Sequence, residues 1–410
     1  MDAWVPRLIS GIGLIMMMAI AWLASSHRSR IPWRTAGWGL FIQFVLAIFL
    51  LKTSVGIATF GFAARGVEAL LEYANMGTRQ VFGPLMDTGF SFALGVLPII
   101  VVMGSLFAIL YHLGVVQWVV RILARVLHAT MGTSPAESLA AISNIFVGMT
   151  ESVLVIKPYL AQLTRSELFA TMSVGMATVA GSVLLAYVNI LGGGEFAGHL
   201  LTASILSAPA GLLLAKIMIP ETETPRTKSL QGMAVERSGQ NIIDAAAEGA
   251  LNGLRLAAYV GAMLLAFVAL IHMMNGILGS LGSLIGLPDL SFQGILGVIL
   301  APLAFMMGIP WQDATQVGSL MGVKIVLNEF LAYQELGAQI AAGELSERSR
   351  IIASYALCGF ANFGSLAILI GGIGAMAPDR RSEVAELGLR SVLAGALATF
   401  MTACVVGILL

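Results

Sequence analysis

The sequence predicts an all-α, polytopic membrane protein, and three observations lead to this fold class. Of its 410 residues, 58% are hydrophobic and only 11% are charged, whereas a soluble domain is typically about 25% charged. Long apolar stretches recur along the chain, and about 20 apolar residues suffice for one membrane-spanning helix. A similar order of segments occurs twice. Disorder is excluded because disordered chains are poor in apolar residues, and a disulfide framework because only two cysteines are present.

Eight apolar stretches are long enough to be spans. They cover residues 8–24, 36–51, 92–113, 168–191, 196–219, 254–278, 351–376 and 387–410. The first stretch is either a cleaved signal peptide or a retained span, and the acidic Asp2 together with the length of the run favours the span. We therefore predict about eight transmembrane helices.

The basic residues predict the orientation in the bilayer. With the N-terminus outside, fifteen Lys and Arg residues fall in cytoplasmic loops and six in outer loops, as the positive-inside rule requires. Lys324 is left unassigned because it lies in an unusual segment. Both termini are thus predicted on the outer side of the membrane. The net charge of zero indicates no nucleic-acid partner.

Four further segments are not simple spans. Residues 54–73 and 115–127 mix apolar and charged residues and are predicted to be interfacial helices. Residues 292–308 are apolar but short for a span, and residues 221–240 are a polar loop.

Two half-apolar segments, 137–160 and 312–336, contain Gly, Asn and Glu. Each could cross the bilayer only with a carboxylate inside it. We therefore predict a re-entrant helical hairpin in each, entering and leaving on one side, because irregular backbone at membrane depth is tolerated where it lines a cavity.

The chain contains a weak internal repeat. Residues 131–138 resemble residues 307–314 at an offset of 176, and short motifs after each hairpin match at an offset of 184. Each unit consists of a span, a surface helix, a hairpin, a broken span and a span. The charge count makes the first unit start inward and the second outward, and such inverted repeats are typical of secondary transporters.

We treat the whole chain, residues 1–410, as one transporter domain. Its predicted parts are first spans and scaffold (1–130), hairpin and spans of unit 1 (131–220), loop, scaffold span and interfacial helix (221–306), and hairpin and spans of unit 2 (307–410).

The candidate functional residues are polar groups inside apolar segments. Glu151 and Glu329 either lie at hairpin ends in water or mark a substrate or ion path, and their similar places in the two units favour the path. Thr178, Ser182, Asn362 and Ser365 sit among small residues that let a helix unwind or pack closely. Asn144 and Asn328 precede the glutamates, and amide oxygens suit hard cations.

Other chemistries are disfavoured. No Cys/His cluster has metal spacing, and no GxxxxGK[ST] loop for ATP occurs. No nucleophile and base pair is legible, so an enzyme is not expected. A passive channel is less expected than a transporter, because a channel needs no alternating gates.

Three runs resemble motifs of the concentrative nucleoside transporters. Residues 144–151 (NIFVGMTE) resemble that family's NIFVGQTE, residues 328–333 (NEFLAY) its NEF(V/L)AY, and residues 358–365 (CGFANFGS) its CGFAN(F/L)xS. Order and spacing agree from about residue 8 to the C-terminus. The resemblance implies eight spans, two opposed hairpins, a homotrimer built on the third and sixth spans, and coupled import of nucleosides by elevator-like movement of the hairpin domain.

The resemblance also implies site residues. The ribose hydroxyls would be bound by Glu329, Asn362 and Ser365, with Phe360 beside them, and the base would lie near Thr150, Glu151 and Val183. A sodium ion would be bound by Asn144, Val147, Thr178 and Val179, the valines through their carbonyls.

The run at residues 149–153 departs from the family pattern, which usually has Gln before Thr-Glu and Ala-Pro after it, where this chain has Ser152 and Val153. Met149 stands where the family usually has Gln, and Met offers a base neither a donor nor an acceptor. We therefore expect a nucleoside substrate with weakened or redirected base selection. Because Asn144 and the Thr178 hydroxyl are present, sodium is favoured as the coupling ion. A proton-coupled importer and an importer of modified nucleosides are the alternatives.

Overall fold

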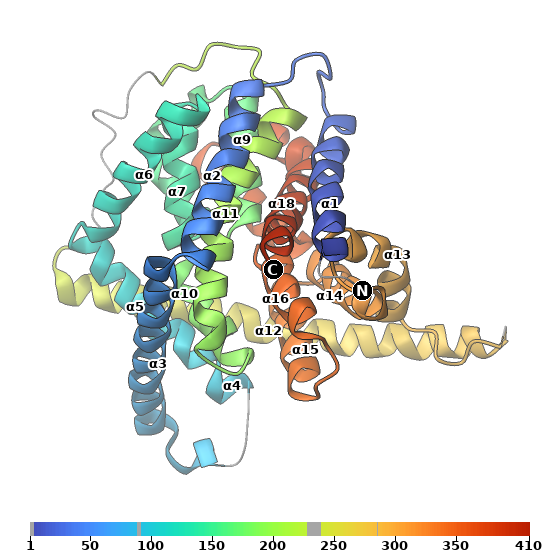
Figure 1. Ribbon diagram of the computed structural model, residues 1–410. Helices are drawn as coiled ribbons and strands as arrows, with labels where there is room; N and C mark the ends of the chain where they lie inside the picture. Colours follow the sequence, from blue (N-terminus) through green and yellow to red (C-terminus); the bar gives the residue numbers. More distant parts are fainter. Residues whose placement is uncertain (1–3, 88–91, 228–238, 285) are drawn as a thin grey trace.

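The protein is all-helical in the computed structural model, which describes residues 4–87, 92–227, 239–284 and 286–410 (Figure 1). No strand occurs within these ranges. Eight helical segments of the described chain are long and apolar enough to cross a membrane, which is the number that the sequence predicts. The two sets differ at one place: Ser54–Met86 is among the eight although the sequence predicts an interfacial helix there, and the predicted span 351–376 is not, because it consists of two shorter helices. The predicted fold class is therefore confirmed.

The helices form an N-terminal group and two series. The N-terminal group is α1 (Trp4–Leu23), α2 (Trp33–Lys52), α3 (Ser54–Phe82) and η1 (Gly83–Asp87). The first series is α4 (Phe92–Gly95), α5 (Leu97–His112), α6 (Val115–Met131), α7 (Pro135–Val147), α8 (Met149–Val155), η2 (Lys157–Gln162), α9 (Arg165–Ala177), α10 (Gly181–Ile190) and α11 (Glu195–Met218). The second series is α12 (Ile242–Leu284), α13 (Phe292–Met306), α14 (Trp311–Val326), α15 (Glu329–Ala341), α16 (Glu347–Leu357), α17 (Phe363–Met376), η3 (Pro378–Arg380) and α18 (Arg381–Leu409).

The two series repeat one order of helices. α7 and α14 begin 176 residues apart, the offset of the sequence repeat, and α8 and α15 begin 180 residues apart. α10 and α17 begin 182 residues apart. The sequence repeat thus corresponds to a recurring set of helices, while the inverted orientation of the two units in a membrane stays a prediction.

Each series contains a helical hairpin: hairpin 1 is α7 with α8, and hairpin 2 is α14 with α15. The two helices of each hairpin pack against each other. α7 starts with a capping box, in which the Ser134 hydroxyl accepts the N–H of Glu137 and the Glu137 carboxylate accepts the N–H of Ser134. It ends at Gly148, whose φ of 102° suits glycine alone. Local sequence thus determines both ends of α7, and re-entry into a membrane stays a prediction.

Two predicted spans are interrupted. The span at 168–191 is α9 followed by α10, and the span at 351–376 is α16 followed by α17. At the first break Thr178 takes extended backbone angles. At the second, Asn362 caps α17 by accepting the N–H of Ser365 at 2.7 Å. The predicted breaks are therefore confirmed, and short polar residues initiate the second half of the later one.

The two breaks lie against each other in the centre of the molecule. A Cβ atom at Gly359 would come within 2.9 Å of the carbonyl oxygen of Ala177, the last residue of α9. Only a residue without a side chain permits this approach. The ends of α9 and α16 are thereby brought together.

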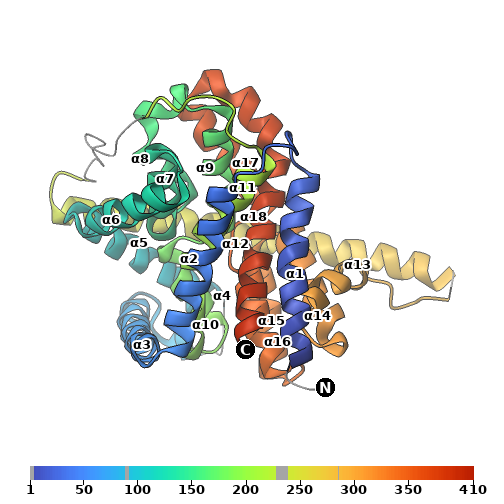
Figure 2. The ribbon, with the colours of Figure 1, turned by 45° about the horizontal axis from the view of Figure 1, so that its top comes forward.

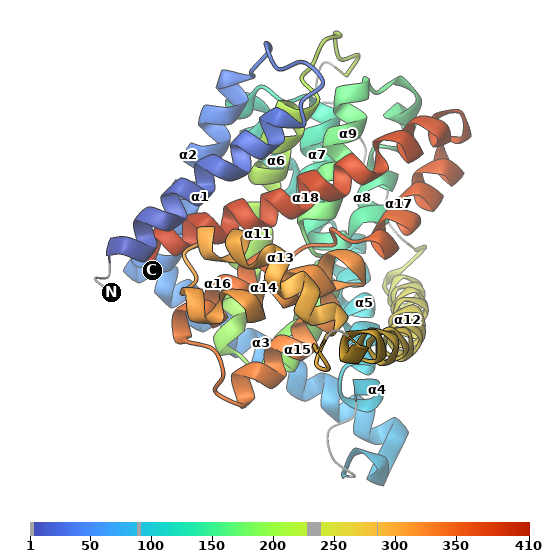
Figure 3. The same cartoon turned by 90° about the vertical axis from the view of Figure 1, so that its right-hand side faces the viewer.

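α12 is longer than the span predicted at 254–278, and the predicted extent is wrong. The helix has 43 residues, crosses the molecule in Figure 1 and is viewed nearly end-on in Figure 3. The apolar stretch stops near charged residues such as Glu248, but a helix continues through them where they face solvent or a cavity. Glycines bring α12 close to α5: a Cβ on Gly249 would lie 2.4 Å from the carbonyl oxygen of Gly104.

The predicted surface helices are present as helices. α3 extends the segment 54–73 as far as Phe82, and its length and composition also suit a span, so an interfacial position stays a prediction. α6 buries one face and exposes Arg121 and Arg125, as amphipathic spacing predicts. α13 is short, and the chain bends by 117° between it and α14. Of the polar loop 221–240, residues 228–238 lie outside the described residues.

The two ends of the chain lie together. α1 packs along α18, and the guanidinium of Arg7 donates to the carbonyl oxygen of Leu410 at 2.9 Å. Figures 2 and 3 show both ends at the same end of this helix pair. The termini therefore share one side of the molecule, and its outward orientation stays a prediction.

Candidate functional site

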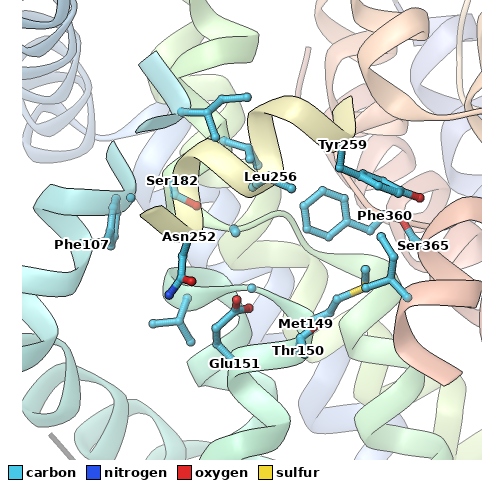
Figure 4. Close-up of a pocket in the computed structure, with 18 of the residues that line it drawn as sticks. Phe107, Met149, Thr150, Glu151, Ser182, Asn252, Leu256, Tyr259, Phe360 and Ser365 are labelled. Carbon is cyan, nitrogen blue, oxygen red and sulfur yellow. The ribbon is translucent and has the colours of Figure 1, made fainter. Parts of the chain in front are cut away.

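Both hairpin tips and both helix breaks meet around one cavity of about 940 Å³, with α5 and α12 forming the remaining wall. All eight residues predicted to bind substrate line it: Met149, Thr150, Glu151, Val183, Glu329, Phe360, Asn362 and Ser365. Figure 4 shows Met149, Thr150 and Glu151 on the side of hairpin 1, with Tyr259, Phe360 and Ser365 across from them. The structure thus brings together residues that lie more than 200 positions apart in the chain.

Glu329 is the first residue of α15, and its buried side chain is held by two donors. The hydroxyl of Tyr187 donates to Oε1 at 2.9 Å, and Nδ2 of Asn362 donates to Oε2 at 2.7 Å. A carboxylate offers about four acceptor positions, so each oxygen keeps capacity for a further donor. The carboxylate is oriented, desolvated and still able to accept two hydroxyl groups.

Asn362 links a helix break to a hairpin tip. Its Oδ1 caps α17 while its Nδ2 reaches Glu329. This double use fixes the amide orientation and, with it, the distance between hairpin 2 and α17. Its ribose-binding role stays a prediction, but the geometry places it beside the carboxylate.

Tyr187 on α10 is a site residue that the sequence analysis missed. Its ring stacks on Tyr333, with centroids 4.7 Å apart, and meets Phe330 edge-on. A tyrosine within an apolar helix needs a hydrogen-bond partner for its hydroxyl, and this requirement is the signal by which Tyr187 could have been found in the sequence.

Glu151 differs from Glu329 in both register and surroundings. It is the third residue of α8, whereas Glu329 is the first residue of α15. When the helix starts are aligned, the counterpart of Glu329 is Met149, so the two glutamates occupy similar but not equivalent positions. Glu151 is open to the cavity, while Glu329 is only 4% exposed.

α12 and α5 supply lining residues that the sequence analysis also missed. Asn252 and Tyr259 of α12 and Phe107 of α5 face the cavity (Figure 4). Asn252 lies just before the predicted span 254–278, where an isolated polar residue looked like part of a loop. The long α12 turns this segment into a wall of the site.

The predicted ion site is partly assembled. Nδ2 of Asn144 donates to the carbonyl oxygens of Val174 at 3.0 Å and Gly175 at 3.4 Å and contacts the Thr178 hydroxyl. Oδ1 of Asn144 is buried and has no hydrogen-bond partner within the described part of the chain. Amide, hydroxyl and carbonyl oxygens are ligands for hard cations, and the unpaired Oδ1 is the atom that a cation would satisfy.

The two valines of the predicted ion site are placed differently. Val147 lies one turn after Asn144 on α7 and lines the cavity. Val179 is buried, and its carbonyl accepts the hydroxyl of Ser204 at 3.1 Å, a partner that the sequence did not indicate. Among the described residues no group of three or more His, Cys, Asp or Glu could hold a metal, so an ion here would have neutral oxygen ligands.

Three family models cover nearly the whole chain. The model described as "Na+ dependent nucleoside transporter N-terminus" matches residues 12–85, "Nucleoside recognition" matches residues 93–194, and "Na+ dependent nucleoside transporter C-terminus" matches residues 199–407. All three describe transport or recognition of nucleosides.

Curated relatives agree with these models. The chain is 48% identical to "Uncharacterized transporter YutK" of Bacillus subtilis over 97% of this chain and 98% of that protein. It is 44% identical to "Solute carrier family 28 member 3" of Mus musculus, over 98% of this chain but only 59% of that longer protein. It is 39% identical to "Sodium/nucleoside cotransporter 1" of Mus musculus, over 98% of this chain and 64% of that protein. These names support sodium as the coupling ion and describe transporters rather than enzymes.

Solved structures of one protein, CNTnw, share the fold. An inward-facing, substrate-bound structure is 44% identical, with a TM-score of 0.93 over 98% of both chains. An outward-facing structure of a variant is also 44% identical, with a TM-score of 0.93 over 98% of this chain and 97% of that one. The existence of both states in this neighbour supports alternating access as the mode of transport for the fold.

Proposed function

The chain belongs to the family of Na+-dependent nucleoside transporters, and from this premise we propose that it imports nucleosides together with sodium. It is a multi-pass membrane protein, and we place it in a bacterial inner membrane with both termini outside. A sodium gradient directed inward would supply the driving force.

The observation that carries this proposal is the arrangement around Glu329. Tyr187 and Asn362 each occupy one acceptor position of the carboxylate, and the free positions face a cavity large enough for a nucleoside. Two vicinal ribose hydroxyls can donate to these positions, and hydrogen bonds to a buried charged acceptor are strong. Ser365 and Phe360 complete the ribose end of the proposed site.

The base is proposed to lie towards hairpin 1, near Thr150, Glu151 and Val183. Met149 presents a thioether there, which contacts a base through dispersion without selecting its polar edge. This observation favours a second candidate substrate class, nucleosides with modified or varied bases.

Sodium is proposed to bind between Asn144, Thr178 and the neighbouring carbonyls, including that of Val147. An ion there would join the last turn of α7 to the last turn of α9 and so hold the tip of hairpin 1 in its binding position. Because coupling between two ligands is reciprocal, sodium would raise nucleoside affinity and a nucleoside would raise sodium affinity by the same factor.

Transport is proposed to follow an elevator movement. The hairpins and broken helices carry the substrate contacts, while α5 and α12 form the opposite wall of the cavity. Sliding of the first group along the second would move the cavity between the two sides. A homotrimer built on α5 and α12 in the lipid bilayer would hold these two helices still.

The test is uptake of radiolabelled nucleosides by vesicles that contain the purified protein. An imposed inward sodium gradient is expected to drive accumulation, and choline in place of sodium is expected to remove it. Accumulation that follows a pH gradient and ignores sodium would establish the proton-coupled alternative. Equilibration without accumulation under any gradient would indicate a passive channel.

A further inference from the structure

Lys324 is a buried lysine that the proposed transport cycle leaves without a role. It lies in the last turn of α14, and its side chain is 0% exposed. Within the described part of the chain, no carboxylate lies within ion-pair distance of its ammonium group. A buried charge without an ion-pair partner is costly and is retained where it has a function.

The ammonium group is bound by neutral groups at the end of a half-helix. Nζ donates to the carbonyl oxygen of Ala356 at 2.9 Å and to the hydroxyl of Thr399 at 2.8 Å, and it lies 5.4 Å from the ring centre of Phe400. Ala356 belongs to the last turn of α16, directly before the break. The C-terminal end of a helix carries partial negative charge and attracts cations.

The same arrangement occurs at hairpin 1, with a different group. Asn144 precedes the first residue of α8 by five positions, and Lys324 precedes the first residue of α15 by five positions. Asn144 reaches the last turn of α9 and a hydroxyl, and Lys324 reaches the last turn of α16 and a hydroxyl. The two residues are therefore equivalent positions of the internal repeat.

We propose that the ammonium group of Lys324 is the built-in cation of the second unit: it neutralises the end of α16 and holds the tip of hairpin 2 there, as sodium does for α9 and hairpin 1. This inference rests on the proposed sodium site at Asn144. A sodium ion enters and leaves, whereas the lysine is covalently attached. Hairpin 2 is thus held in its binding position at every sodium concentration.

This role makes Lys324 a positioning residue for the nucleoside. Glu329 follows it by five residues and is the first residue of α15 at the hairpin tip. The ammonium group keeps Glu329 beside Asn362, so the ribose end of the site is ready before sodium binds. Sodium then controls only the end of the site formed by hairpin 1.

The test is nucleoside binding to the purified protein in detergent, measured by calorimetry with and without sodium. Lys324→Ala is expected to lower nucleoside affinity about tenfold or more, because charged hydrogen bonds are lost. Ethylammonium added to the buffer is expected to restore much of this affinity, since it fits the space of the missing side chain. Lys324→Asn, which copies Asn144, is expected to bind a second sodium ion and to show a steeper sodium dependence.

Two variants control for structural damage. Lys324→Met fills the space without a charge, so it is expected to lose affinity and to gain nothing from ethylammonium; it also serves if the alanine variant does not fold. Lys216→Ala removes a second lysine that is buried among the described residues and that pairs with Glu137 at 2.7 Å at the base of hairpin 1. Ethylammonium is expected to leave its nucleoside affinity unchanged.

The proposal is overturned if folded Lys324→Met binds nucleosides like the wild type. It is also overturned if ethylammonium fails to restore the alanine variant and Lys324→Asn keeps the wild-type sodium dependence. If nucleoside binding to the wild type does not depend on sodium, the proposed sodium coupling is wrong. The role of Lys324 is then still decided by whether ethylammonium restores the nucleoside affinity of Lys324→Ala.

Discussion

Hairpin 1 and hairpin 2 have the same helical outline but differ in where a buried lysine lies: beside the base of hairpin 1 and at the tip of hairpin 2. At the base of hairpin 1, Glu137 forms a buried ion pair with Lys216. At the base of hairpin 2 the carboxylate of Asp313 accepts hydrogen bonds from Ser346 and Ser349, and it has no ion-pair partner among the residues that the structure describes. At the tips, the buried lysine belongs to hairpin 2, and hairpin 1 has a neutral residue at the equivalent position.

The tip of hairpin 2 holds a fixed ammonium group, Lys324, and a carboxylate, Glu329, of which each oxygen accepts one hydrogen bond from the protein. The tip of hairpin 1 holds the neutral Asn144, with an unpaired buried oxygen, and Glu151, open to the cavity. The two units of the repeat therefore share their backbone arrangement but differ in which positions are charged. In our proposal, the half of the site at hairpin 2 is assembled before any ligand binds, whereas the half at hairpin 1 is completed by sodium and the nucleoside.

The largest expected effect is at the base of hairpin 1. Lys216→Met would leave Glu137 buried without a counter-charge, and breaking a buried ion pair in this way costs about 3–5 kcal/mol. We expect a clearly lower melting temperature in detergent. Asp313→Asn changes the corresponding carboxylate at the base of hairpin 2, whose partners are neutral hydrogen-bond donors. It is expected to lower the free energy of unfolding by about 1–3 kcal/mol. Equal losses of stability in the two variants would show that the bases of the two hairpins do not differ.

The next effect is at the tip of hairpin 2. Glu329→Gln removes the acceptor of two hydrogen bonds, and we expect nucleoside uptake to fall about 100-fold or more. Glu151→Gln is expected to reduce uptake less, because this carboxylate is open to the cavity. Initial uptake rates at equal protein content in vesicles measure both variants. A wild-type rate in Glu329→Gln would sink the assignment of the ribose site.

A smaller effect is expected at the tip of hairpin 1. Asn144→Ala removes one oxygen ligand, so the sodium concentration for half-maximal uptake should rise about tenfold. Nucleoside affinity without sodium should stay at the wild-type value, because Asn144 is proposed to bind the ion and is not among the residues that line the cavity. Titrating sodium against uptake and binding measures both quantities. An unchanged sodium dependence would place the ion elsewhere.

The smallest effect concerns selection of the nucleobase at the tip of hairpin 1. Met149→Gln introduces a donor and an acceptor at the start of α8 and is expected to change the ratio of uptake rates between nucleosides by about 3- to 10-fold. The requirement for ribose hydroxyls should not change. Competition of unlabelled nucleosides against one labelled substrate gives this ratio. An unchanged profile would show that Met149 does not face the base.

Much of the fold follows from local features of the sequence. The ends of α7 follow from Ser134, Glu137 and Gly148, and the break before α17 follows from Asn362, because caps and glycines act within a few residues. The long α12 was harder to predict. Its polar residues face a cavity, and this cavity exists only after α5 and the hairpins have packed around them.

The sequence by itself determined the membrane class, the family and the lining residues of the hairpin tips and helix breaks, since apolar length and contiguous motifs are legible without a structure. Only the tertiary structure decided which partners these residues meet. Glu329 meets Tyr187 from 142 positions earlier, and Lys324 meets Thr399 from 75 positions later. Such pairs depend on how the two helix breaks pack against each other, and no local pattern encodes that packing.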